Sequence, residues 1–160
     1  MEDDEKRALL TFLDAQRASV LAIIDGLDDK ALTTSVVPSG WTPLGLVEHL
    51  GHAERHWFQE ILTGSADPLP WHDENTPLLT TRPPSVVLDF YRTQCERSNA
   101  ILAALPLSTI PRGRHPDPLG EETTDLRRIT LHMIEETARH AGHLDLAREL
   151  LDGETGLGPR

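Results

Sequence analysis

The stretch from Asp125 to Leu151 contains no proline and constrains the fold more than any other part of the chain. Its apolar residues recur three, four or eleven positions apart, which predicts one long amphipathic helix; they are Ile129, Met133, Leu144, Ala147 and Leu151. Glu136 and His140 fall on the same inward stripe, where a charge is costly unless it is paired or bound to a metal. Being four residues apart, their side chains point the same way. The pattern therefore predicts two ligands of a metal site that needs a third from another helix.

Three further segments have helical periodicity, over Asp3–Asp25, Pro43–Leu62 and Ser85–Leu105. Thr42 before Pro43, Ser85, and Thr123 or Thr124 are the predicted N-caps of the second, third and last helices. The inner face of the third helix is predicted to use Val86, Leu88, Phe90, Tyr91, Ile101 and Leu102. The second and third connections, Thr63–Pro84 and Leu105–Gly120, are long and rich in proline, so we expect no helix in them. No segment alternates like a strand, and the fold class predicted is all-α, a four-helix bundle.

The size and charge of the chain exclude several classes of protein. Its 160 residues suit one domain, which we expect over residues 1–152, with a flexible tail over 153–160. A formal net charge of −11 repels nucleic acid, and no run of apolar residues is long enough for a membrane span. A single cysteine, Cys95, fits a reducing cytoplasm, where we expect the protein to stay, and is expected to be a small helix residue.

The second predicted helix supplies the candidate for the third ligand. His49, His52 and His56 lie on one strip beside its buried side. If the second and last helices are neighbours, His49 faces Glu136 and His140 across the core. Two imidazoles and one carboxylate suit a divalent metal, Zn²⁺ first and Ni²⁺ or Fe²⁺ as alternatives, in a site that keeps open positions. The alternative for Glu136 is a salt bridge to Arg139 or Arg128 on a wet helix edge.

The sequence gives weaker evidence for the roles of the other histidines. His52 and His132 are the candidate catalytic residues, either accepting a proton or orienting a ligand, and His132 has a structural hydrogen-bonded role as its alternative. His143 is expected to contact a ligand residue, and His56 to lie at the surface or in an amphipathic contact. His72 and His115 are expected to be solvated, and Trp41 and Trp57 to be core residues.

Two segments carry a resemblance to a known family: SGWTPLGLVEHLGHAERHWF and HMIEETARHAGHLDLARELLDG. With both in this order, the chain resembles the DinB-like superfamily, in the branch related to mycothiol-dependent maleylpyruvate isomerase. The resemblance implies a four-helix bundle that holds a metal through His49, Glu136 and His140, and a low-molecular-weight thiol such as mycothiol as cosubstrate. The isomerase has a further C-terminal domain, so we do not expect maleylpyruvate isomerisation itself.

These observations lead to one principal hypothesis and two alternatives. The principal hypothesis is a metal-dependent transferase or isomerase that joins a mycothiol-like thiol to a small electrophile. The first alternative is a non-catalytic stress protein whose structural metal is closed by His52 or His143 as a fourth ligand. The second is a metallohydrolase that needs no thiol. We expect a homodimer, as helical bundles of this family often pair.

Overall fold

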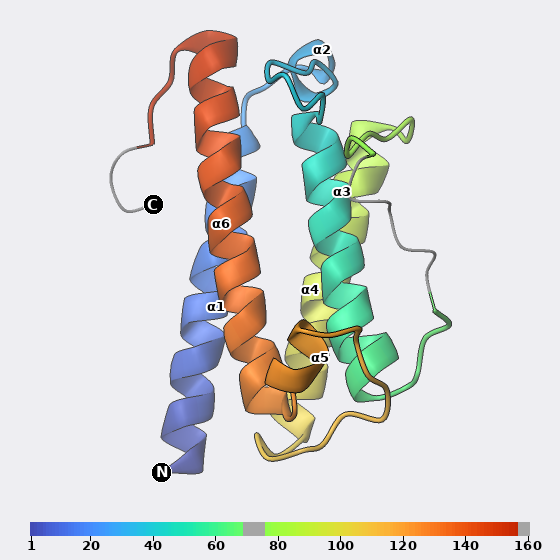
Figure 1. The fold of residues 1–160 in the computed structure, drawn as a ribbon. Coiled ribbons are helices and arrows are strands. Elements are labelled where there is room, and N and C mark those ends of the chain that lie inside the picture. Colours follow the sequence, from blue (N-terminus) through green and yellow to red (C-terminus); the bar gives the residue numbers. More distant parts are fainter. Residues whose placement is uncertain (69–75, 157–160) are drawn as a thin grey trace.

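Four long helical segments lie side by side and form a bundle (Figure 1). The computed structural model describes residues 1–68 and 76–156. The segments are α1 (Glu2–Ile24), α3 (Pro43–Glu54) continued by η1 (Arg55–Leu62), α4 (Pro84–Ala104) and α6 (Leu126–Asp152). Helix α1 packs on α6 and α3 packs on α4, while contacts of α3 with α6 and of α1 with α4 close the bundle. The predicted all-α four-helix bundle is confirmed.

The helix ends show where local sequence signals were interpreted correctly and where they were not. Thr42 caps α3 as predicted, because its hydroxyl accepts a hydrogen bond from the Gly45 amide at 3.1 Å. Helix α6 is instead capped by Asp125, whose carboxylate accepts a hydrogen bond from the Arg128 amide at 2.9 Å. The Thr123 hydroxyl donates to the Leu119 carbonyl at 2.7 Å. Ser85 is also not a cap, because α4 already begins at the preceding proline, whose fixed φ suits the first turn.

Two short helices were not predicted. Helix α2 (Asp29–Leu32) lies in the connection between α1 and α3, and α5 (Leu119–Glu122) lies at the end of the connection in which no helix was expected. Four residues are too few for a periodic apolar pattern, so neither helix has a signal that periodicity could find. The cap of α2 is more visible, because the Asp28 carboxylate accepts a hydrogen bond from the Ala31 amide at 2.8 Å.

The predicted second helix changes its winding after Glu54. Residues 55–62 form a π-helix, η1, in which hydrogen bonds join residues five positions apart. The wider turn alters which residues share a face, and it buries both His56 and Trp57. Such turns are rare and occur frequently at functional sites.

Close packing of α3 on α4 sets the position of the helix that carries His49. A Cβ atom at Gly51 would lie 2.6 Å from the Phe90 ring, so any larger residue here would displace this ring. On α4, Val87 and Tyr91 are fully buried, whereas Val86, predicted inside, is 43% exposed. None of the helices in the described residues combines the length and the apolar character needed to cross a bilayer. The division into a domain over 1–152 and a tail over 153–160 stays a prediction.

Candidate metal centre

His49, Glu136 and His140 come together where α3 faces α6. The Nε2 atom of His49 lies 3.1 Å from Oε1 of Glu136, and Nε2 of His140 lies 2.9 Å from the same oxygen. The rings of His49 and His140 meet edge to face with their centroids 5.0 Å apart. One ligand atom from each residue lies within 4.8 Å of the other two. Helices α3 and α6 are therefore neighbours, which was the condition for His49 to face this pair.

The three side chains are half-buried and electrostatically coupled. Burial by itself would raise the pKa of the Glu136 carboxyl, but hydrogen bonds from His140 and His49 hold that pKa well below its usual range. Glu136 is therefore an anion between two imidazoles. Its contacts are to imidazoles rather than to the arginines proposed as alternatives; Arg128, for example, donates to the Glu122 carbonyl.

The donor set fits a divalent transition metal. Ligand atoms about 2.0–2.1 Å from a tetrahedral ion lie roughly 3.3 Å from one another, close to the two nitrogen–oxygen separations here. Two neutral imidazoles and one carboxylate are also ligands that Zn²⁺, Ni²⁺ and Fe²⁺ accept. Three protein ligands with partial exposure match the pattern of a site that keeps a position for a small molecule. The assignment of these residues as metal ligands stays a prediction.

His143 contacts the back of His140. Their Nδ1 atoms are 3.3 Å apart, and the His143 ring lies 6.3 Å from that of Trp41, measured between centroids. The Nε2 atom of His140 faces Glu136 and its Nδ1 atom faces His143, so the contact with His143 helps to fix the orientation of the His140 ring. This is the supporting contact expected for His143 from the sequence.

The two histidines predicted to be catalytic lie in different surroundings. The ring of His52 packs against Phe90 of α4, with centroids 4.8 Å apart, and is not part of the group formed by His49, Glu136 and His140. His132 lies on α6, one helical turn before Glu136, with its ring 4.7 Å from that of Trp57. The catalytic roles of both stay predictions.

The remaining histidines and tryptophans differ in how far their positions match the expectations from the sequence. His56, expected at the surface or in an amphipathic contact, is only 4% exposed and lies in the π-helical segment η1. His115, expected to be solvated, is half-buried and its ring stacks on Trp57 at 4.8 Å. Trp57 is buried as expected, and Trp41 is half-buried against the core. His72 lies outside the described residues.

Sequence reasoning missed a second buried polar cluster, which joins α1, α3 and α4. Arg17 donates to both carboxylate oxygens of Glu54, from Nε and Nη2, at 2.7 Å each. Its Nη1 also donates to Asp14 at 2.8 Å and to Asn99 at 2.6 Å. Arg17 falls among apolar residues of α1 at helical spacing, and that position is the signal that could have revealed the pair.

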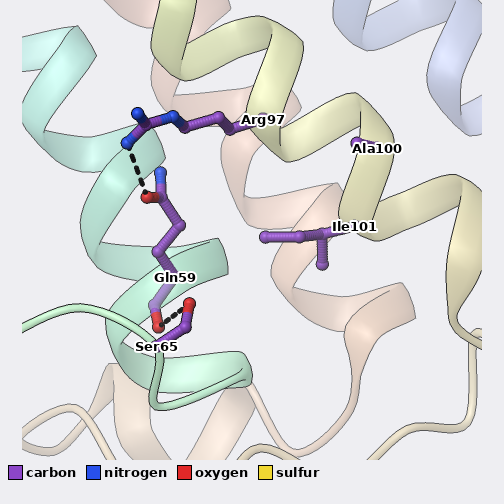
Figure 2. A pocket seen from close by; sticks show the side chains of 5 residues that line it. All are labelled: Gln59, Ser65, Arg97, Ala100 and Ile101. Carbon is purple, nitrogen blue, oxygen red and sulfur yellow. Dashed lines mark hydrogen bonds between the residues drawn. The ribbon is translucent and has the colours of Figure 1, made fainter.

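A pocket between η1 and α4 lies apart from these histidines (Figure 2). Its lining is Gln59, Ser65, Arg97, Ala100 and Ile101. Arg97 donates to Oε1 of Gln59 at 3.5 Å, and the Gln59 amide donates to Gln94 at 2.6 Å. This lining contains no imidazole or carboxylate, so the pocket does not offer the ligands of a metal centre.

Comparison with known proteins identifies one family. A family model described as mycothiol-S-transferase matches residues 8–153, which is most of the chain and includes all three residues of the candidate centre. No curated protein and no solved structure matches the chain.

Proposed function

The chain belongs to the mycothiol-S-transferase family, and we propose that it transfers a low-molecular-weight thiol, mycothiol or a close relative, to a small electrophile. The observation that carries this proposal is the convergence of His49, Glu136 and His140 from two helices. In such a reaction the thiol loses its S–H proton, its sulfur bonds to an electrophilic carbon, and the leaving group departs with its electron pair.

The three residues would hold a divalent metal, with Zn²⁺ the first candidate and Ni²⁺ or Fe²⁺ the alternatives. A bound ion would supply Lewis-acid chemistry, which lowers the pKa of a thiol so that thiolate forms near neutral pH. Glu136 contributes the negative charge that holds a cation, and the contact from His143 keeps His140 oriented. The partial exposure of the side chains lets the thiol enter and its proton leave to solvent.

The positions of His52 and His143 support an open site over a closed structural one. A fourth ligand would have to approach the same side as the Nε2 atoms of His49 and His140. His143 instead contacts the opposite nitrogen of His140, and His52 packs against Phe90 of α4. We therefore favour the transferase over a protein with a purely structural metal.

The proposal also includes a cytoplasmic location and a homodimer. A cytoplasmic location suits an enzyme whose cosubstrate must stay reduced, and the presence of a single cysteine supports it. A homodimer is supported by exposed apolar side chains on α1 and α6, namely Phe12, Leu146 and Leu150. Light scattering of the purified protein would measure the molar mass and so test the dimer.

The experiment that tests the function uses Co²⁺-substituted protein, because a sulfur ligand entering an open site changes the visible spectrum. We expect mycothiol to change the spectrum, and the protein to consume an electrophile such as monobromobimane only when the thiol is present. His140→Ala should lose both the metal and the thiol-dependent rate, while Leu131→Ala, an exposed change on the same helix, should keep both. Turnover without any thiol would favour a hydrolase, and full activity in His140→Ala would contradict the assignment.

A further inference from the structure

Arg97 on α4 is an exposed cation without a carboxylate partner among the described residues. Its neighbour on the same helix, Arg92, pairs with Asp89 at 3.4 Å. The contact that Arg97 makes is with Oε1 of Gln59 at 3.5 Å, which is long for a hydrogen bond. A guanidinium has five N–H donors in a planar fork. The described part of the chain therefore leaves most of the donors of Arg97 to solvent or to a ligand.

Gln59 of η1 holds this guanidinium beside the pocket that both residues line (Figure 2). Gln59 is 7% exposed, and its side-chain amide donates to Oε1 of Gln94 at 2.6 Å. Because the amide nitrogen is used in this way, the side-chain oxygen of Gln59 faces Arg97. Gln94 is itself buried, so the packing of η1 on α4 fixes both glutamines. The pocket thus contains a cation whose position is set by a neutral neighbour.

The pocket is a cavity of about 280 Å³ between η1 and α4. Arg97 lies at one end and Ser65 at the other, and the Ile101 side chain points into the space between them (Figure 2). Ala100 completes the wall on α4, and most of the exposed lining is apolar. The volume is slightly below the usual range of sites for drug-sized ligands, so it suits a smaller molecule.

The turn that carries Ser65 is fixed by the backbone of η1. The amides of Gly64 and Ser65 donate to the Glu60 and Gln59 carbonyls at 3.1 and 2.7 Å. Gly64 has a φ of +62°, a left-handed conformation that glycine adopts without strain. The Ser65 hydroxyl lies 2.7 Å from that of Thr63. The end of the pocket opposite Arg97 is therefore preformed, as small-molecule sites usually are.

The lining determines the chemical class of the ligand. A guanidinium fork binds a carboxylate through two parallel hydrogen bonds, and none of the lining residues carries a carboxylate that could take this place. The net charge of −11 repels anions from the surface as a whole, so an anion needs a local cation together with a second source of affinity. Ala100 and Ile101 supply that source through apolar contact. A carboxylate with an apolar body uses both features, whereas a phosphate group uses only the first.

We infer that this pocket binds a small monocarboxylic acid, with the carboxylate on Arg97 and the apolar body against Ala100 and Ile101. The site goes beyond the proposed function, because it lies between η1 and α4, whereas the candidate metal centre lies where α3 faces α6. It uses none of the predicted metal ligands. Binding of the acid and binding of the thiol are therefore separate properties, and either can fail without the other.

Benzoate and benzamide are suitable test compounds, since they share a ring but benzamide carries no charge. Backbone amide shifts of the ¹⁵N-labelled protein, as purified, are followed by NMR while each compound is added. Benzoate should shift the amides that border the pocket, within residues 59–65 and 97–101. Benzamide should bind at least about tenfold more weakly, because it lacks the charge that strengthens the hydrogen bonds from Arg97.

Arg97→Gln removes the guanidinium from an exposed position and should weaken benzoate binding about tenfold. Arg92→Gln is the matched control, because it removes the same charge from the same helix at a position that is paired with Asp89. Its affinity for benzoate should stay within about twofold of the wild type, since salt screens a distant exposed charge. Equal affinity of Arg97→Gln and the wild type would overturn the site.

Ala100→Phe tests the cavity without a change of charge. Ala100 is exposed, so the added ring fills the pocket rather than the core, and the benzoate-induced shifts should disappear. Unchanged binding in this variant, no shifts in the wild type, or equal affinity of the wild type for benzoate and benzamide would contradict the inference. Shifts confined to His49 and residues 136–140 would place benzoate at the candidate metal centre instead, which would also overturn it.

Discussion

Two carboxylates in this bundle are each held by basic side chains, yet their surroundings differ. Glu54 is 1% exposed, and both of its oxygens receive hydrogen bonds from the single guanidinium of Arg17 at 2.7 Å. Glu136 is about a quarter exposed, and one of its oxygens contacts imidazoles from two different helices. The carboxylate of Glu54 is buried and fully hydrogen-bonded, whereas Glu136 and its two histidines are three potential metal ligands that are partly exposed to solvent.

The difference separates a structural polar cluster from a candidate reactive one. Fork-shaped pairing between arginine and a carboxylate satisfies every donor that faces the pair, so nothing else needs to bind. Imidazole nitrogens and a carboxylate oxygen about 3 Å apart instead offer ligands to a cation. We call Arg17 with Glu54 the closed cluster, and His49, Glu136 and His140 the open cluster. We expect changes at the closed cluster to alter stability, and changes at the open cluster to alter metal and thiol binding.

The largest effect should come from breaking the closed cluster. Arg17→Ala leaves the Glu54 carboxylate buried without its partner, which should lower the free energy of unfolding by about 3 to 5 kcal/mol. Urea denaturation of the metal-free protein measures this change. Arg127→Ala, which removes an exposed ion pair with Glu5, should change stability little.

The same Arg17→Ala protein, where folded, should still bind one metal ion per chain. If Arg17→Ala lost the metal but kept the free energy of unfolding of the wild type, Arg17 and Glu54 would serve metal binding rather than stability, which would contradict the comparison.

A smaller effect is expected at the support of the open cluster. His143→Ala removes the ring that contacts Nδ1 of His140, and such supporting contacts contribute roughly 10- to 100-fold to metal affinity. Competition with a chromophoric chelator measures the affinity, with Leu131→Ala as the exposed control on the same helix. An unchanged affinity in His143→Ala would mean that His140 is oriented by its packing alone.

The stability of the metal-free protein should also depend on pH through the histidines near the open cluster. Burial lowers the pKa values of the His56 and His132 imidazoles, against the opposing effect of Glu60 on His56 and of Glu136 on His132. An unfolded imidazole has a pKa of about 6.5, so their contribution to stability is complete above that pH. It is lost as the pH falls from there through the lowered pKa values.

Urea denaturation at pH 7.5, 6.5 and 5.5 should show this loss, and His132→Phe should flatten the profile because one titrating imidazole is gone. Stability that rose toward pH 5.5 would contradict the burial of these rings.

The smallest effect concerns Cys95, which lies beside the closed cluster. Burial, together with the nearby Glu54 carboxylate, raises the pKa of its thiol to about 12. The thiol should therefore be almost fully protonated at pH 8 and react with Ellman's reagent only after unfolding. Rapid reaction in the native protein would show that the region around Glu54 opens to solvent.

Much of the fold and the candidate centre could be predicted because both depend on helical spacing. The stripe through Ile129 and Met133 identified α6, and the four-residue offset of Glu136 and His140 identified the pair that His49 completes. Short caps and helices escaped prediction because they depend on single hydrogen bonds. The burial of His56 escaped because it follows from the π-helical winding of η1, which apolar periodicity does not signal.

The pairing of Arg17 with Glu54 could not be predicted, since it joins residues 37 positions apart on different helices. The contact of His115 with Trp57 has the same cause, because a proline-rich loop brings a distant residue onto η1. A single sequence shows which residues share a helix face, but it does not show which loop residue covers that face.

The most direct test of the central claim is elemental analysis of the purified protein with and without Glu136→Ala. We predict one divalent transition-metal ion per chain in the wild type and less than a tenth of that in the variant, in which two imidazoles remain without the anion. An equal metal content in both proteins, or none in the wild type after purification without chelators and reconstitution with Zn²⁺, would contradict the proposed centre.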